Sequence, residues 1–123
     1  MDPGQLVRFL ESPLAEEIRR GGNLLREYRF TLLMDARDYD GAAAGGDRML
    51  LQGVVDCCFE TAEGLTVVDF KTDHVRTPEE VAQRAAHYRP QLEAYSGALE
   101  RVLEKRVARR VLYFLTPGET VEV

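Results

Sequence analysis

Alternation of apolar and polar residues predicts three consecutive β-strands in the first 71 residues. The expected strands span residues 24–34, 49–60 and 65–71, and Glu63-Gly64 forms the turn between the last two. One face of the first strand is apolar throughout, with Tyr28, Phe30, Leu32 and Met34 at every second position. Residues 35–48 are small, polar and rich in glycine and aspartate, so we expect them to form a flexible hairpin loop.

Helical patterns flank these strands on both sides. Residues 1–23 are predicted to be a helical lead-in, with helix starts at Asp2-Pro3 and Ser12-Pro13. A longer helical stretch begins at Thr77-Pro78, where threonine caps the helix and proline fits its first turn. It continues to residue 105, either as one helix or with a break or kink at Pro90. Its apolar stripe consists of Tyr88, Leu92, Tyr95, Leu99 and Val102.

A last core strand is expected over residues 106–116, followed by a turn at Pro117-Gly118 and a short edge segment over residues 120–123. The residues expected on one face of this strand are Val107, Val111, Tyr113 and Leu115. The order of elements is therefore α-β-β-β-α-β, which indicates an α/β fold. With 123 residues, of which 45% are hydrophobic and 30% charged, the chain fits one domain with its core at residues 24–116.

Charge and composition exclude several classes of protein. The net charge of −5 argues against a free-standing protein that holds nucleic acid by bulk electrostatics, although residues 71–110 carry nine basic and six acidic side chains. No apolar run approaches the roughly 20 residues that span a membrane, so we expect a cytoplasmic protein without membrane contact. Cys57 and Cys58 are neighbours on a strand and point to opposite faces, which indicates reduced core residues rather than a disulfide.

Two charged residues at the end of the third strand are the first candidates for chemistry. Asp69 and Lys71 are two positions apart and share a strand face, and the second strand carries Asp56 late in its run. Such groups are costly to bury unless they pair, bind a metal or line a cleft. A purely structural ion-pair network is one interpretation of this set.

Metal-assisted phosphodiester cleavage is the other interpretation. Two carboxylates supply the hard oxygen ligands that Mg²⁺ prefers, and a lysine beside them can orient or deprotonate the attacking water and stabilise developing negative charge. The Phe70 side chain is expected in the opposite layer, while its backbone carbonyl stays available as a neutral metal ligand. Asp56, Asp69 and Lys71 are therefore our candidate catalytic residues.

Three stretches together resemble a known family. Gly53-Val54-Val55-Asp56, the run from Val67 to Asp73 and the helical run from Tyr88 to Tyr95 are similar to the nuclease domain of RecB-type and AddA-type helicase–nuclease subunits. That group belongs to the PD-(D/E)XK superfamily. The resemblance covers about residues 24–116 and implies a restriction-endonuclease-like fold, in which a central mixed β-sheet is flanked by helices.

The resemblance also implies roles for individual residues. It makes Asp56, Asp69 and the Phe70 carbonyl metal ligands and Lys71 the catalytic lysine. It places Gln91 and Tyr95 at the border of the site in contact with DNA, together with Tyr88 and Thr72. The implied cofactor is Mg²⁺, with Mn²⁺ as a substitute. No phosphate-cradling glycine loop with its lysine occurs in the sequence, so no ATP site is expected in this chain.

The function implied by the resemblance is that of an exonuclease which processes DNA ends during double-strand break repair by recombination. Its expected partners are DNA, single-stranded as it leaves a helicase, attached helicase domains and a second helicase–nuclease subunit. One departure matters: the family's metal-binding histidine upstream of the first strand is missing, since His74 and His87 are the only histidines. We therefore expect the 123 residues to be a fragment of a longer subunit, inactive in isolation if that ligand is required.

Alternatives remain open at this point. One is a non-catalytic module with the nuclease fold that serves docking or DNA guiding, and another is a standalone restriction-type endonuclease. Among single residues, Glu27 is either a support residue or a solvated strand carboxylate, and His74 is a loop residue near the site. Several arginines could steer a DNA strand or form a solvated face: Arg76, Arg84 and Arg89 near the site, and a cluster of Arg101, Lys105, Arg106, Arg109 and Arg110.

Overall fold

A five-stranded mixed sheet forms the centre of the computed structural model, which describes residues 2–35 and 48–123. Its strands lie side by side in sequence order: β1 (Gly22–Asp35), β2 (Arg48–Thr61), β3 (Gly64–Lys71), β4 (Val107–Phe114) and β5 (Glu119–Glu122). Only β3 and β4 pair in parallel, and the other neighbours are antiparallel. The predicted mixed sheet and its order of elements are confirmed, with β5 as the short edge strand.

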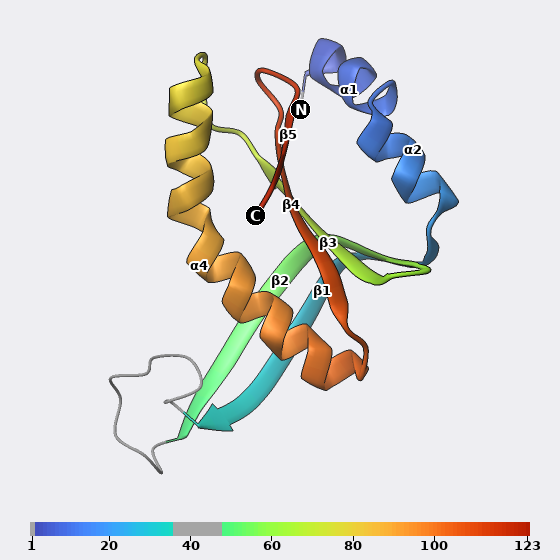
Figure 1. Ribbon diagram of the computed structural model, residues 1–123, viewed down its shortest axis with the longest axis vertical. Helices are drawn as coiled ribbons and strands as arrows, with labels where there is room; N and C mark the ends of the chain where they lie inside the picture. The colour runs from blue at the N-terminus through green and yellow to red at the C-terminus, as the bar shows by residue number, and fades with distance from the viewer. Residues whose placement is uncertain (1, 36–47) are drawn as a thin grey trace.

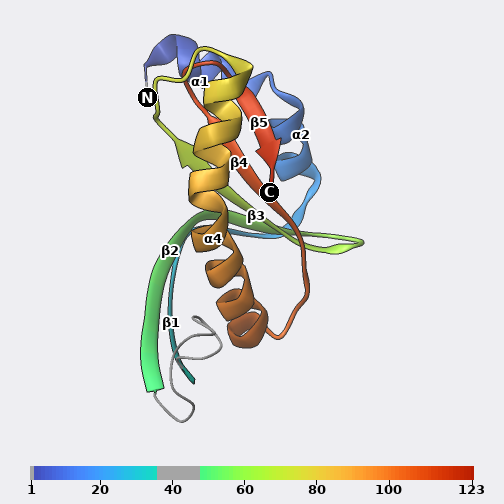
Figure 2. The same ribbon diagram turned by 60° about the vertical axis from the view of Figure 1, so that its left-hand side comes forward.

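Helices cover both faces of this sheet (Figures 1 and 2). Helix α4 (Pro78–Leu103) lies across one face, while α1 (Pro3–Leu10) and α2 (Pro13–Arg20) lie on the other. All three begin at the predicted capping residues, because the side chains of Asp2, Ser12 and Thr77 each accept a hydrogen bond from a backbone N–H in the first turn. No helix in the described ranges is long and apolar enough to cross a membrane.

Alternation along β3 and β4 fills the core on both faces. Val67 on β3 packs toward α4, whereas Val68 and Phe70 pack on the face of α1 and α2. Cys57 and Cys58 divide between the same two clusters, both buried and unbonded, as predicted. A strand buried on both faces reads as an almost continuous apolar run, and the third strand has this pattern up to Asp69.

One predicted strand face in β4 is wrong at its first residue. Val111, Tyr113 and Leu115 share the cluster under α1 and α2, but Val107 packs on the α4 side. The pairing with β3 shifts register here, since Leu65 pairs with Val107 and Thr66 with Arg109. An extra residue inserted into a strand reverses the facing of what precedes it.

Helix α4 continues through Pro90 without a break. The proline lies near the middle of the 26-residue helix, and the helix changes direction about midway along its length (Figure 1). The predicted apolar stripe holds up to Leu99, but Val102 is 37% exposed and Leu103 packs against the core in its place.

Strands β1 and β2 extend beyond the rest of the sheet. They pair as far as Asp35 with Arg48, whereas β3 pairs with β2 only from Cys57 to Thr61. The far half of the hairpin is thus a two-stranded ribbon, and its residue Phe30 packs against Tyr95 of α4. The loop predicted at 35–48 ends in these two paired residues, and its residues 36–47 lie outside the described ranges.

Candidate active site

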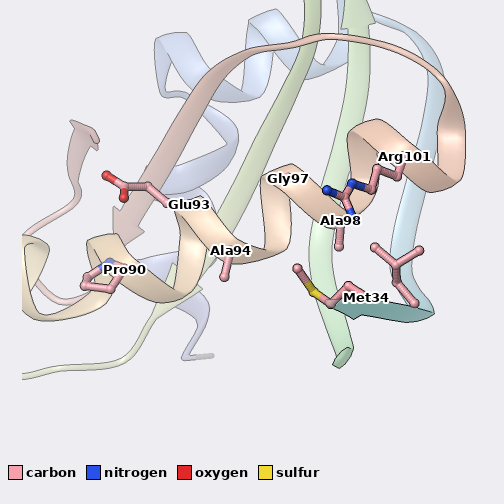
Figure 3. A pocket seen from close by; sticks show the side chains of 8 residues that line it. Met34, Pro90, Glu93, Ala94, Gly97, Ala98 and Arg101 are labelled. Atoms are coloured by element: carbon pink, nitrogen blue, oxygen red, sulfur yellow. The ribbon is translucent and has the colours of Figure 1, made fainter. Parts of the chain in front are cut away.

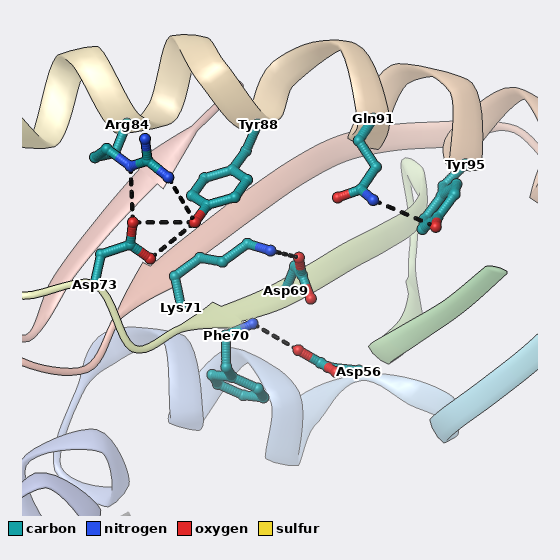
Figure 4. Close-up of polar contacts among 9 residues, drawn as sticks. All are labelled: Asp56, Asp69, Phe70, Lys71, Asp73, Arg84, Tyr88, Gln91 and Tyr95. Atoms are coloured by element: carbon teal, nitrogen blue, oxygen red, sulfur yellow. Dashed lines mark hydrogen bonds and ion pairs between the residues drawn. The ribbon is translucent and has the colours of Figure 1, made fainter.

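The end of β3 places a carboxylate and an ammonium group side by side (Figure 4). Lys71 Nζ lies 2.7 Å from Asp69 Oδ2, and both side chains are 17% exposed. The pair arises because residues two apart on a strand share a face, and because this face lies under α4 rather than in open solvent. The structure therefore brings together the two charges that the sequence singled out.

Asp56 joins them from the neighbouring strand. Its Oδ2 accepts a hydrogen bond of 2.8 Å from the backbone N–H of Phe70, just beyond the last ladder pair of β2 and β3, Cys57 with Val68. A carboxylate thus replaces the main-chain acceptor where the strands separate. Since N–H and C=O of a strand residue face the same neighbour, the Phe70 carbonyl is also directed toward β2.

The proximity of two carboxylates changes the acidity of Asp69. Burial raises its pKa to about 6, the neighbouring Asp56 carboxyl acts in the same direction, and Lys71 opposes both. A site that penalises a second negative charge in this way is chemically suited to a cation.

The donor set fits a hard divalent metal such as Mg²⁺. It contains two carboxylates and a backbone carbonyl, and Mg²⁺ commonly takes one or two protein carboxylates and fills its remaining positions with water and substrate phosphate. Within residues 2–35 and 48–123, no group of three histidine, cysteine, aspartate or glutamate side chains could hold a metal. The set thus lacks a third protein side chain, in line with the missing upstream histidine.

Helix α4 contributes an aromatic residue that contacts the lysine. Lys71 Nζ lies 4.0 Å from the centre of the Tyr88 ring. The Tyr88 hydroxyl donates to the Asp73 carboxylate, with distances of 2.9 and 3.0 Å to its two oxygens, and Arg84 binds the same carboxylate at 2.8 Å. Burial alone would raise the pKa of Asp73, but the hydrogen bonds from Arg84 and Tyr88 outweigh it and lower the pKa.

Gln91 and Tyr95 project from the same side of α4 toward the end of β3 (Figure 4). Gln91 Nε2 lies 3.4 Å from the Tyr95 hydroxyl, and the Tyr95 ring packs edge-on against Phe30 at 5.2 Å. A Cβ atom at Gly53 would lie 2.7 Å from both of these rings. The glycine three residues before Asp56 is therefore needed for packing: it lets α4 approach β2 closely enough to border the site.

Other predicted residues lie further from the centre. Thr72 is exposed directly after β3, and His74 is exposed beside it. His87 is exposed on α4, where its ring packs edge-on against Tyr88. The interpretation of Arg84 as a DNA-steering residue needs correction, because its guanidinium is paired with Asp73.

The distal basic cluster is largely neutralised by acidic groups and the chain end. Arg109 pairs with Glu17 and Glu122, Lys105 pairs with Glu60, and Arg110 donates to the Val123 carbonyl. These contacts join α2, β4 and β5, so they account for most of the cluster without DNA.

A groove opens beside Asp56 on the face of α1 and α2. It has a volume of about 660 Å³, and its lining residues are Leu6, Phe9, Leu10, Ile18, Arg26, Glu27, Asp56, Cys57 and Phe70. Glu27 has a left-handed backbone (φ 47°) in mid-strand, a conformation that strand periodicity could not predict. A second cavity, of about 400 Å³, lies between β1 and α4 (Figure 3) and contains none of the candidate catalytic residues.

Asp73 is the contact residue that sequence reasoning missed. It belongs to the stretch from Val67 to Asp73, yet its position in the sequence suggests no role by itself. The signal was present in Arg84 and Tyr88, which are four apart on a helix and so share one face.

Comparison with known proteins gives consistent matches over nearly the whole chain. The family model of the PD-(D/E)XK nuclease superfamily matches residues 3–122. The chain is 35% identical over 122 residues to an ATP-dependent helicase/nuclease subunit from Acetivibrio thermocellus, with 96% of the chain and 10% of the relative covered. Similar matches are found to proteins of the same name from Heliobacterium modesticaldum (35% identical, 93% of the chain, 8% of the relative) and Bacillus velezensis (30% identical, 98% and 10%).

The chain spans about a tenth of the length of these relatives. The family model, by contrast, accounts for almost every described element, from α1 to β5. The mixed sheet with Asp56 and Asp69 on neighbouring strands and Lys71 beside them agrees with that match. The chain belongs to the PD-(D/E)XK nuclease superfamily.

Proposed function

We propose that residues 1–123 form the metal-dependent DNA nuclease domain, an exonuclease, of a longer helicase–nuclease subunit. The observation that carries this proposal is the meeting of Asp56, Asp69 and Lys71 at the separation of β2 and β3. The name shared by the relatives, which describes an ATP-dependent helicase/nuclease subunit, supports the wider context.

The candidate residues divide the chemistry among them. Asp56, Asp69 and the Phe70 carbonyl would hold Mg²⁺, or Mn²⁺ in its place. When bound, the metal supplies Lewis-acid stabilisation of the charge that develops on the phosphate. Lys71 orients or deprotonates the attacking water and donates to the developing negative charge. The Asp69 carboxylate keeps the ammonium group within reach of the reacting atoms through the ion pair.

The proposed substrate is single-stranded DNA delivered by attached helicase domains. Gln91 and Tyr95 on α4 border the site and would contact the strand, with Tyr88 and Thr72 nearer to Lys71. Within the described ranges few unpaired basic groups surround the site, so we propose that helicase domains and a second subunit supply most of the DNA affinity. The role that follows is processing of DNA ends in double-strand break repair by recombination.

Cleavage of labelled single-stranded DNA tests this function. The full-length gene product that carries the chain is assayed with Mg²⁺ and with Mn²⁺, and Asp69→Ala and Lys71→Ala are each expected to reduce the rate by about 10²- to 10⁴-fold. Lys105→Ala is the matched control, because it removes the only other lysine of the chain, which pairs with Glu60 at the surface. Cleavage at the wild-type rate by Asp69→Ala or Lys71→Ala would show that the assignment is wrong.

A non-catalytic module for docking or DNA guiding is the second candidate. The observation that favours it is the absence, within the described ranges, of three side chains that could hold a metal together. Metal titration separates the two functions. A docking module would bind neither Mg²⁺ nor Mn²⁺ near Asp56 and Asp69 while still binding DNA, whereas a nuclease requires the metal.

A further inference from the structure

Lys71 is restrained from two directions. Its ammonium group pairs with Asp69 on its own strand, at 2.7 Å, and lies 4.0 Å from the centre of the Tyr88 ring on α4. A lysine side chain has four rotatable bonds and strongly hydrated donors, so an ion pair alone leaves its position loosely defined. The aromatic face adds an attractive second contact that closes off the α4 side of the side chain.

Tyr88 itself is held more firmly than core packing requires. Its ring packs beside the cluster around Leu92 and Phe114, yet its hydroxyl also donates to both oxygens of Asp73 and accepts from Arg84 at 3.1 Å. Asp73 lies just after β3 and two residues beyond Lys71. The helix and the end of the catalytic strand are thus joined through one hydroxyl group (Figure 4).

A purely structural interpretation explains only part of this geometry. An aromatic side chain at this place would bury the same surface without the hydroxyl, and Arg84 with Asp73 would already join α4 to the end of β3. What the hydroxyl adds is a fixed orientation of the ring, because its hydrogen bonds lock the tip of the side chain. A fixed ring in turn fixes where the ammonium of Lys71 can lie.

We propose that Tyr88, anchored by Asp73 and Arg84, is a positioning residue that holds the Lys71 ammonium in place against Asp69. This inference rests on the proposed nuclease function for its significance, but the placement itself can be measured without cleavage. Asp73 and Arg84 act through Tyr88, so neither needs to touch DNA or metal.

Nuclear magnetic resonance of lysine side chains tests the placement directly. The chain contains only two lysines, Lys71 and Lys105, so protein labelled with ¹³C-lysine gives two assignable ε-methylene signals. A methylene beside an aromatic face is shielded, and we expect the Lys71 signal upfield of the Lys105 signal. Tyr88→Leu is expected to move the Lys71 signal to the unshielded position and leave Lys105 unchanged.

Two further variants separate the ring from its anchor. Tyr88→Phe keeps the ring and loses the hydroxyl, so the Lys71 signal should stay shielded but to a smaller extent as the ring gains freedom. Arg84→Gln removes one of the two groups that bind Asp73 and should act in the same direction. An unshielded Lys71 in the wild type, or a Lys71 signal unchanged in a folded Tyr88→Leu variant, would overturn the proposal.

Kinetics of the full-length gene product provide the functional readout. Tyr88→Leu is expected to lower kcat about tenfold or more with little change in KM, because misplacement of a reacting group acts on the chemical step. Tyr88→Phe should recover most of that loss, and Glu93→Gln, an exposed change on the same helix, serves as the control. A Tyr88→Leu variant with unchanged kcat would refute the positioning role. Failure of the wild type to cleave DNA while Lys71 remains shielded would instead refute the proposed function.

Discussion

The metal-free protein should become less stable as its second carboxylate ionises. Because the pKa of Asp69 is raised to about 6 by burial and by Asp56, the folded state binds the proton more tightly than the unfolded chain does. The stabilisation from this proton is therefore complete below the ordinary pKa of 3.8 and is lost as the pH rises through 6.

The size of the effect follows from the same values. At about 1.4 kcal/mol per pKa unit, a rise from 3.8 to about 6 corresponds to about 3 kcal/mol of unfolding free energy between pH 4 and pH 7. Asp69→Asn removes the titrating group and keeps the shape of the side chain. The variant should therefore gain about 3 kcal/mol relative to the wild type over this interval, whatever constant offset the lost ion pair with Lys71 introduces.

Urea unfolding in EDTA at a series of pH values provides the assay. The quantity to compare is the difference in unfolding free energy between Asp69→Asn and the wild type at each pH, so that other titrating groups cancel. Saturating Mg²⁺ should flatten the pH dependence of the wild type, because a metal ligand must be deprotonated. A difference that stays constant from pH 4 to pH 7 would refute the account of the two-carboxylate site.

Other predictions concern packing and DNA contacts. Gly53→Ala should cost about 1–3 kcal/mol of unfolding free energy, because its Cβ would lie 2.7 Å from two aromatic rings; Gly97→Ala, with nothing within 4 Å, should gain about 0.5–1 kcal/mol. Urea unfolding checks both, and equal effects would contradict the packing argument. Arg89→Ala, at an exposed residue of α4, should lower the slope of log affinity for single-stranded DNA against log salt by about 1. Arg109→Ala, whose side chain is paired, should leave it unchanged, as fluorescence anisotropy would measure.

Local rules were sufficient to predict most of the fold. Period-two alternation locates the strands, and the capping residues Asp2, Ser12 and Thr77 locate the helix starts, because these signals depend on neighbours in the chain. The same rule placed Asp69 and Lys71 on one face, and the structure has them paired.

What the sequence could not provide depends on contacts across the fold. The facing of Val107 changes with a register shift between β3 and β4, and the left-handed backbone of Glu27 lies within a strand that alternates normally. The helix runs through Pro90, where propensity favours a break. The hydrogen bonds of Asp73 join two elements whose distance only tertiary packing determines.

The link between Asp73 and α4 illustrates the limit most clearly. Arg84 looked like a free basic residue near the site, and only the folded chain shows that its charge is bound. Candidate DNA contacts inferred from charge alone therefore need the positions of their acidic neighbours, since a paired guanidinium contributes little to steering.

Binding of Mn²⁺ followed by electron paramagnetic resonance tests the central claim most directly. The signal of free Mn²⁺ is titrated against the full-length gene product as wild type, Asp69→Asn and Lys71→Met. We predict that the wild type and Lys71→Met bind the ion, and that Asp69→Asn weakens its Kd by at least about tenfold, because a charged ligand is lost. Equal Mn²⁺ binding by Asp69→Asn and the wild type would contradict a metal site built on Asp56 and Asp69.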